Sequence, residues 1–252
     1  MTDIDELPPY RAVLVVDTQE FGGHSDRGQA ALADAIPEVL ALAFERAGLG
    51  HVWREALFPH DTGDGFGLGF ATRHLPAVVM RFFGSLQEVL AERDTRWPAV
   101  GRRVRLRMRA SLHVGPVRDP GPAAVGSAVI TTHRLLDAPE VRDLLARSDP
   151  AQTFLVVALS QRIFEDVLRT EYALLPPSLL VARRVEVKEY SGTVHLYVPR
   201  PSGDLLTHGF GDGPVVPDPP RPAATTNVIT GGAFDTAIQI GHLHGDLRRE
   251  QG

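Results

Sequence analysis

The chain has 252 residues, of which 43% are hydrophobic and 23% are charged, and its formal net charge is -5. This size and composition are typical of a globular protein with one sizeable core. The net charge gives no general attraction to nucleic acid, and no apolar run approaches the ~20 residues that a membrane-spanning helix needs. The absence of cysteine excludes disulfides and thiolate metal sites. The acidic N-terminus carries no secretory signal, so we expect a cytoplasmic protein.

The first part of the chain alternates between predicted strands and helices. Residues 11–17 (RAVLVVD) form a short apolar run, which predicts a buried strand with Asp17 at its carboxyl end. Apolar residues at helical spacing then predict one helix over residues 29–47, with Gly48 as its C-cap, and a second helix over residues 75–94.

Between these helices, residues 58–70 (FPHDTGDGFGLGF) predict a hairpin. Two strand-like runs meet at Gly63-Asp64-Gly65, and an Asp-Gly pair in that setting is a strong turn signal. After the turn every second residue is glycine, so one face of the second strand is almost bare and something can approach its backbone. An acidic side chain at this tip is well placed to hold a metal and a phosphate, but Asp64 equally suits a simple turn former.

The second part of the chain begins with strict alternation over residues 103–114. One face carries Val, Leu, Met and Ala, and the other carries four arginines, Ser111 and His113. This pattern predicts a strand with one buried and one solvated face. The arginines also suit an anion site, but we favour the solvated face.

Further elements follow at short intervals. Residues 126–136 and 139–147 predict helices, and Thr153–Leu159 predicts a strand. Ser160 is expected to cap a helix that runs to about Thr170. The segments 183–190 and 193–198 predict a closing hairpin through Ser191-Gly192.

The order of these elements indicates an α/β sandwich, with helices packed against a partly antiparallel sheet, over residues 1–199. Residues 200–226 are rich in proline and glycine and lack apolar periodicity, which predicts a flexible linker. Residues 227–252 form a C-terminal tail of a different composition, with Ile, Val and Phe suited to β-pairing.

Several of these segments resemble the catalytic domain of class III nucleotidyl (adenylate and guanylate) cyclases. VVDTQEF is similar to the strand end that carries the family's first metal-binding aspartate, which places that role on Asp17 and a nearby aromatic on Phe21. TGDGFGLGF resembles the hairpin of the second metal-binding aspartate, here Asp64. SLHVGPV and KEYSGTVHLYV are like later strands of the domain, and VGSAVITTHRLL resembles the helix with the transition-state arginine, here Arg134.

The resemblance implies a ferredoxin-like core with helices on a mixed, largely antiparallel sheet. It also implies conversion of a nucleoside triphosphate to a cyclic nucleotide and pyrophosphate, with two Mg²⁺ or Mn²⁺ ions between the two aspartates and Arg134 as the catalytic cation. The implied substrate-binding residues are Phe21, Gly63, Gly65 and His60. In the family the site forms between two domains, so we expect a homodimer and an inactive lone monomer.

Three positions depart from the family pattern. Ile130 stands where an asparagine usually precedes the arginine by four positions, His60 aligns with a base-reading lysine, and Ala123 aligns with the acidic partner of that lysine. This pattern permits an unusual nucleotide preference, and equally a module that binds a nucleotide without turning it over. The alternatives for single residues are a polar strand end at Asp17 and a surface charge at Arg134.

The tail carries a second resemblance. Ile238-Gln239-Ile240-Gly241 is similar to the core of RIP-homotypic-interaction motifs, and its frame from Asn227 to Gly245 resembles bacterial amyloid signalling motifs. Stacked Ile and Gln side chains suit zipper layers and ladders. The resemblance implies an NLR-like STAND ATPase receptor and a role in bacterial immunity, with clustering that activates a cyclase. The alternatives are a frayed terminus, and an inactive cyclase-like module that signals through assembly alone.

Overall fold

A computed structural model describes residues 6–96, 105–118 and 126–211. The chain divides into two units, Met1–Val216 and Pro217–Gly252, and the second unit lies wholly outside the described residues. Within the described ranges, no helix is both long and apolar enough to cross a membrane.

The first unit is built around a seven-stranded sheet with the order β2-β3-β1-β4-β5-β7-β6. Neighbouring strands are antiparallel except for β4 and β5, which run parallel. The strands are β1 (Tyr10–Thr18), β2 (Leu57–Asp61), β3 (Gly65–Ala71), β4 (Met108–Pro116), β5 (Leu155–Ser160), β6 (Leu180–Val187) and β7 (Tyr190–Tyr197).

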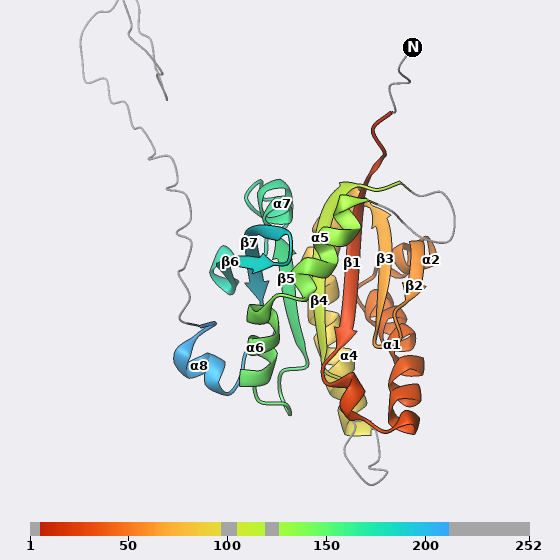
Figure 1. Ribbon diagram of the computed structural model, residues 1–252, viewed down its shortest axis with the longest axis vertical. Helices are drawn as coiled ribbons and strands as arrows, with labels where there is room; N and C mark the ends of the chain where they lie inside the picture. The colour runs from red at the N-terminus through yellow and green to blue at the C-terminus, as the bar shows by residue number, and fades with distance from the viewer. Residues whose placement is uncertain (1–5, 97–104, 119–125, 212–252) are drawn as a thin grey trace, which may run out of the picture. The chain divides into compact units, whose positions relative to one another are not determined.

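Helices cover both faces of this sheet (Figure 1). One face packs against α1 and α4, and the other against α5 and α6. The helices are α1 (Asp26–Arg46), α2 (Gly50–Arg54), α3 (Leu75–Ala77), α4 (Phe83–Arg96), α5 (Ser127–Leu136), α6 (Pro139–Arg147), α7 (Gln161–Ile163) and α8 (Asp204–His208), with π-helical turns at Val78–Phe82 and Phe164–Leu168 and 3-10 turns at Phe21–Gly23, Thr72–His74 and Pro177–Leu179. This arrangement confirms the predicted sandwich of helices on a mixed, largely antiparallel sheet.

The apolar run of β1 is explained by burial on both faces. Ala12, Leu14 and Val16 belong to the core under α1 and α4, whereas Val13 and Val15 pack with α5 residues. Because side chains alternate along a strand, Asp17 lies on the α5 face.

The helix α1 begins three residues earlier than predicted and continues through Pro37 to Arg46. The backbone N–H of Gly28 donates a hydrogen bond to the Ser25 side chain at 3.4 Å, which caps the first turn. Gly48 has a φ of +70° just after the helix, as expected of a residue that ends it.

The solvated face predicted for residues 103–114 is wrong for the described part of that segment. Ser111 is fully buried, and its hydroxyl donates to the Thr132 carbonyl oxygen of α5 at 2.8 Å. Arg107 is 7% exposed and precedes β4. The reason is that α5 folds back over Ser111, and that the end of α6 and the residues before β5 enclose Arg107.

The closing hairpin turns at Lys188-Glu189, not at Ser191-Gly192. Lys188 takes the left-handed conformation with a φ of +52°. Gly192 instead pairs with Val185, and a Cβ there would lie 2.6 Å from the Tyr190 hydroxyl oxygen. The glycine therefore makes room for an aromatic side chain two residues earlier, a role that the sequence pattern does not distinguish from a turn.

Residues 200–211, which we assigned to the linker, pack against the domain. The Thr153 hydroxyl donates to the Arg200 carbonyl oxygen at 2.6 Å, and Leu205 of α8 is buried. Asp204 pairs with Arg147 of α6 at 2.6 Å. Residues 200–211 are therefore part of the folded domain.

The edge strands differ from the central ones. β2 contains Pro59 and an irregular register between Leu57 and His60. At the other edge, β6 alternates buried residues with the exposed Arg184 and Glu186.

Candidate functional site

The two predicted metal-binding aspartates lie next to each other at one end of the sheet. Asp17 ends β1 and stands opposite Gly65 of β3. The Thr18 N–H donates to the Asp64 carbonyl oxygen at 2.8 Å, which ties the hairpin tip to the end of β1. Asp17 at the end of β1 and Asp64 in the turn before β3 are therefore neighbours, close enough for the Asp64 charge to raise the pKa of Asp17.

The hairpin tip has the geometry that its sequence predicts. Gly63 has a φ of +86°, a conformation that favours glycine, and its N–H donates to the Asp61 carboxylate at 2.6 Å. The Thr62 hydroxyl donates to Asp64 Oδ1 at 3.3 Å. These contacts position the Asp64 side chain at the end of the turn.

The glycine face of β3 is covered by the chain itself over much of its length. A Cβ on Gly67 would overlap the His60 ring, and a Cβ on Gly69 would overlap the Phe58 ring. Both rings come from β2, so the glycines at these positions accommodate neighbouring side chains. Gly65 is different, because a Cβ there would overlap the Val16 carbonyl oxygen of β1.

We expect Gly65→Ala to lower the free energy of unfolding by about 1–3 kcal/mol, because the clash is with backbone that cannot turn away. Gly84→Ala is the control: nothing lies within 4 Å of a Cβ at this position of α4, so alanine should be neutral or stabilise by about 0.5–1 kcal/mol. Urea unfolding of both variants measures the difference. Equal stabilities would show that β3 can shift away from β1.

A third charged residue, Arg109 of β4, forms an ion pair with the Asp17 carboxylate. Arg109 stands opposite Asp17 in the register of β1 and β4. Its Nε donates to Asp17 Oδ1 at 2.7 Å and its Nη2 to Oδ2, and the two side chains are only 12% and 14% exposed. This two-pronged contact is the strongest geometry available to an arginine and a carboxylate.

Burial raises the pKa of Asp17 to about 6. Arg109 acts in the opposite direction, and the nearby Asp64 charge raises the pKa further. The carboxylate is therefore protonated more readily in the folded chain than in the unfolded one.

This shift predicts a pH-dependent stability difference between the wild type and Asp17→Asn. A raised folded-state pKa stabilises the fold below about pH 4, and this contribution is lost as the pH rises through about 6. Between pH 4 and 7 the wild type should lose about 2–3 kcal/mol relative to the variant. Denaturant titrations at each pH test this. In the variant Arg109 has lost its partner, which changes the free energy of unfolding by the same amount at every pH. A difference between wild type and variant that does not change with pH would contradict the raised pKa.

Arg134 lies on α5 and is held by a different partner. Its Nη2 donates to Glu189 Oε1 in the β6–β7 turn at 2.9 Å, and its side chain is 20% exposed. Among the described residues, no hydrogen bond or ion pair joins Arg134 to Asp17 or Asp64. Ile130, one turn earlier, is 51% exposed. The structure therefore brings the two aspartates together and leaves the predicted catalytic arginine apart from them.

The remaining predicted site residues lie on separate segments. Phe21 follows β1 in a short 3-10 turn and packs against the core. The His60 ring lies 6.3 Å from that of His133 on α5, centroid to centroid. Burial lowers the pKa of His133, and the neighbouring His60 adds to this effect. Asn227, Ile238, Gln239, Ile240, Gly241 and Ala123 lie outside the described residues.

Sequence reasoning missed Arg109 and His133. In the sequence Arg109 is one of four alternating arginines, and only its pairing opposite Asp17 distinguishes it. The sequence shows only that two predicted strands each carry a charged residue, Asp17 at the end of one and Arg109 within the other. Face and register, which decide the contact, come from the tertiary structure.

Asp17 and Asp64 offer carboxylate oxygens, the donors that Mg²⁺ prefers. Burial makes the ionised form of Asp17 unfavourable, and a bound cation would offset this cost. Within the described ranges, no cluster of three or more His, Asp and Glu side chains could hold a metal. The two carboxylates therefore fit a divalent cation whose other ligands come from substrate and water, provided that Arg109 releases Asp17.

Neither a protein-family model nor a curated protein matches the sequence. Solved structures with the same fold include the adenylate/guanylate cyclase/hydrolase from Silicibacter pomeroyi, with a TM-score of 0.50 and 18% identity, covering 75% of this chain and 94% of that one. A bacterial light-regulated adenylyl cyclase aligns with a TM-score of 0.54 and 13% identity, covering 83% of this chain and 60% of that one.

The described unit thus has a nucleotidyl cyclase fold. More particularly, its architecture is similar to that of solved adenylate and guanylate cyclase structures.

Proposed function

We propose that this chain is a nucleotidyl cyclase that converts a nucleoside triphosphate to a cyclic nucleotide and pyrophosphate. The observation that carries the proposal is the meeting of Asp17 and Asp64 at one end of a cyclase-type sheet. Mg²⁺ or Mn²⁺ ions, when bound between these carboxylates, would supply activation of the 3′-hydroxyl and neutralisation of the phosphate oxygens.

The residues of this chain have separate tasks in that reaction. Asp17 and Asp64 hold the cations, and Asp17 does so only when its contact with Arg109 opens. Gly65 lets β3 lie close to β1, and Gly63 allows the turn at the tip. Phe21 and His60 border the place for the nucleotide. Arg134 offsets the charge that builds up on the α-phosphate.

A second copy of the chain supplies Arg134 to the site in this proposal. Within one chain Arg134 is paired with Glu189, and among the described residues it makes no hydrogen bond or ion pair with either aspartate. A homodimer that sets α5 of one copy against the Asp17 edge of the other would join the parts, and a lone monomer would be inactive. Activity should then depend on protein concentration.

We further propose that the C-terminal tail, residues 227–252, controls this association. Assembly on an NLR-like receptor through Asn227 and the Ile238–Gly241 tetrad would concentrate the domains, and a high effective concentration favours dimers. In this role the protein is an immune effector that is switched on by clustering.

A second candidate is an inactive cyclase-like module that signals through assembly alone. Two observations favour it: Arg109 occupies both oxygens of Asp17, and the exposed position one turn before Arg134 carries the apolar Ile130. In this case the protein would bind a nucleotide and release no product.

Incubation of the full chain with ATP, GTP, CTP or UTP and Mg²⁺ or Mn²⁺, with and without preformed tail fibrils, tests the proposal. Mass spectrometry of the products should identify one cyclic nucleotide, and fibrils should raise its yield. Binding without product under every condition would favour the inactive module. Equal turnover of tail-deleted and fibril-seeded protein would remove the tail from the mechanism.

A further inference from the structure

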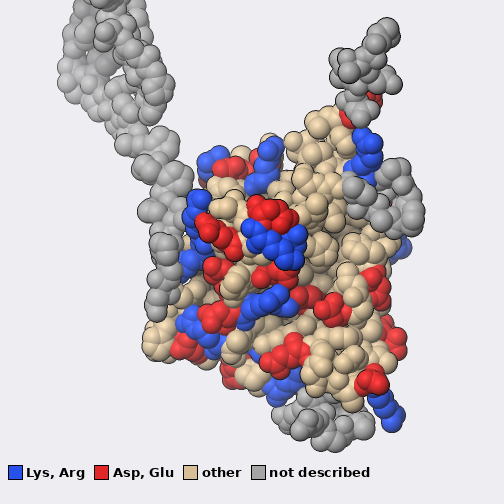
Figure 2. All heavy atoms as spheres, in the orientation of Figure 1, with Lys and Arg blue, Asp and Glu red and all other residues tan. Residues whose placement is uncertain are grey.

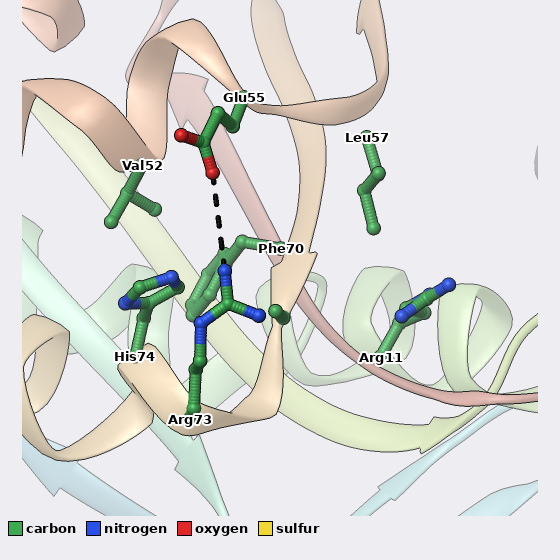
Figure 3. A pocket seen from close by; sticks show the side chains of 8 residues that line it. Arg11, Val52, Glu55, Leu57, Phe70, Arg73 and His74 are labelled. Atoms are coloured by element: carbon green, nitrogen blue, oxygen red, sulfur yellow. Dashed lines mark ion pairs between the residues drawn. The ribbon is translucent and has the colours of Figure 1, made fainter.

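The ion pair between Arg109 and Asp17 is largely shielded from water. Its side chains are 12% and 14% exposed, and both carboxylate oxygens accept a hydrogen bond from the guanidinium. By contrast, Arg73 and Glu55 lie 3.9 Å apart with side chains that are 69% and 65% exposed (Figure 3). Water can replace a partner lost from an exposed pair, but not one lost from a shielded pair. A ligand that takes Asp17 must therefore also leave Arg109 with a partner.

The charged groups around Asp17 leave little negative charge for a cation. The side chains whose charges act on it are Arg109, Asp64 and Arg142. Arg142 is paired with Asp137 at 2.8 Å, so this pair adds no net charge. The two carboxylates and the Arg109 guanidinium together carry a single net negative charge when both aspartates are ionised. Two divalent cations bring four positive charges, so a site filled by cations alone would be strongly positive.

A cation on Asp17 would act directly against Arg109. It repels the guanidinium and competes with it for the carboxylate oxygens, which now accept the two N–H groups. A guanidinium is always charged, and buried donors in native proteins are almost always paired. Arg109 therefore needs another acceptor once a cation arrives. A polyphosphate offers oxygens that an arginine can bind in pairs, and it also supplies the negative charge that the cations require.

We propose that this site takes up divalent cations only together with a polyphosphate, and that Arg109 is the residue that couples the two. The inference rests on the proposed cyclase function and adds a condition to it. A cation alone meets a closed ion pair, whereas a complex of cation and polyphosphate gives Asp17 and Arg109 new partners at the same time. Coupling between two ligands is reciprocal. The polyphosphate alone therefore also binds weakly, because Asp17 and Asp64 repel it.

Isothermal titration of the full chain with Mn²⁺, with inorganic tripolyphosphate and with their preformed equimolar complex tests this coupling. The complex should bind at least about tenfold more tightly than either component alone, a factor within the usual range of coupling between two ligands. Tripolyphosphate has no 3′-hydroxyl and cannot be cyclised, so this measurement does not depend on turnover.

Arg109→Met removes the charge and keeps a long side chain. It should bind Mn²⁺ alone at least about tenfold more tightly than the wild type, because the cation no longer has to displace hydrogen bonds between charged groups. Loss of Arg109 raises the pKa of Asp17, so all titrations are done at about pH 8 to favour the ionised carboxylate. If this variant does not fold, Arg109→Lys still decides. Lysine keeps the charge but cannot hold both oxygens as arginine does, so Mn²⁺ affinity should rise by a smaller factor.

Arg73→Met is the matched control. It makes the same charge change in an exposed ion pair, and Arg73 follows the end of β3 that lies about 20 Å from Asp17. This distance exceeds the ~8 Å over which salt screens exposed charges, so Mn²⁺ affinity should be unaltered. A complex that binds no more tightly than Mn²⁺ alone, no gain in the Arg109 variants, or an equal gain in Arg73→Met would overturn the proposal. Coupled binding without any cyclic nucleotide from the four nucleotides would instead contradict the proposed function and leave the coupling standing.

Discussion

Asp64→Asn should lower cyclic nucleotide formation by at least about a hundredfold, because it removes one of the two carboxylates proposed to hold the metal ions. The fold should survive, since an asparagine oxygen can still accept the hydrogen bond from Thr62. Initial rates at saturating nucleotide and metal measure the loss, with circular dichroism to confirm the fold.

Asp61→Asn provides the comparison within the same hairpin. Asp61 is exposed and accepts a hydrogen bond from the Gly63 N–H, a contact that an amide oxygen can also make. This variant should keep most of the activity. Equal losses in the two variants would mean that the net charge of the hairpin matters and not the position of Asp64.

Arg107→Ala should destabilise the fold by about 2–4 kcal/mol, because it leaves buried acceptors without donors. The Arg107 guanidinium donates to the carbonyl oxygens of Thr153 and Leu145 at 2.9 and 2.7 Å, and also to the side chains of Gln19 and Ser148. It thereby joins the start of β4 to the end of α6 and to the residues before β5. Urea unfolding at neutral pH measures the change.

The control is an arginine in an exposed ion pair. Arg162 pairs with Asp166 at 2.9 Å, and both side chains are about half exposed. Its replacement by alanine should cost less than about 1 kcal/mol. Equal stabilities of the two variants would contradict this prediction. They would mean that removing the buried Arg107 charge gains as much free energy as the loss of its hydrogen bonds costs.

Local signals in the sequence were sufficient for most of the elements. The apolar run before Asp17, the turn at Gly63-Asp64 and the helical spacing of α5 and α6 each depend on neighbours within a few residues. The order of the motifs indicated the fold. The pairing of β1 with β3 sets Asp17 opposite Gly65, the residue after Asp64.

Contacts between distant segments were not predictable in the same way. Alternation over residues 103–114 shows that a strand has two faces, but only the return of α5 decides that both are buried. The same applies to Arg109, whose role depends on its register opposite Asp17. The glycines of β3 and Gly192 were ambiguous because glycine serves turns and close packing alike.

Figure 2 shows acidic and basic side chains interspersed over the face that carries α5 and α6. Neither sign of charge dominates the described part of this face, so it offers no large positive patch that would attract a polyanion over a long range.

The two outer strands bear on how such domains behave when they are crowded. An unprotected outer strand offers free N–H and C=O groups to another sheet, which leads to aggregation. Here Pro59 and the irregular register interrupt β2, and the exposed Arg184 and Glu186 place charges along β6. Both devices oppose sheet-to-sheet joining, so the folded domains of many copies held close together would not add their outer strands to a growing fibre.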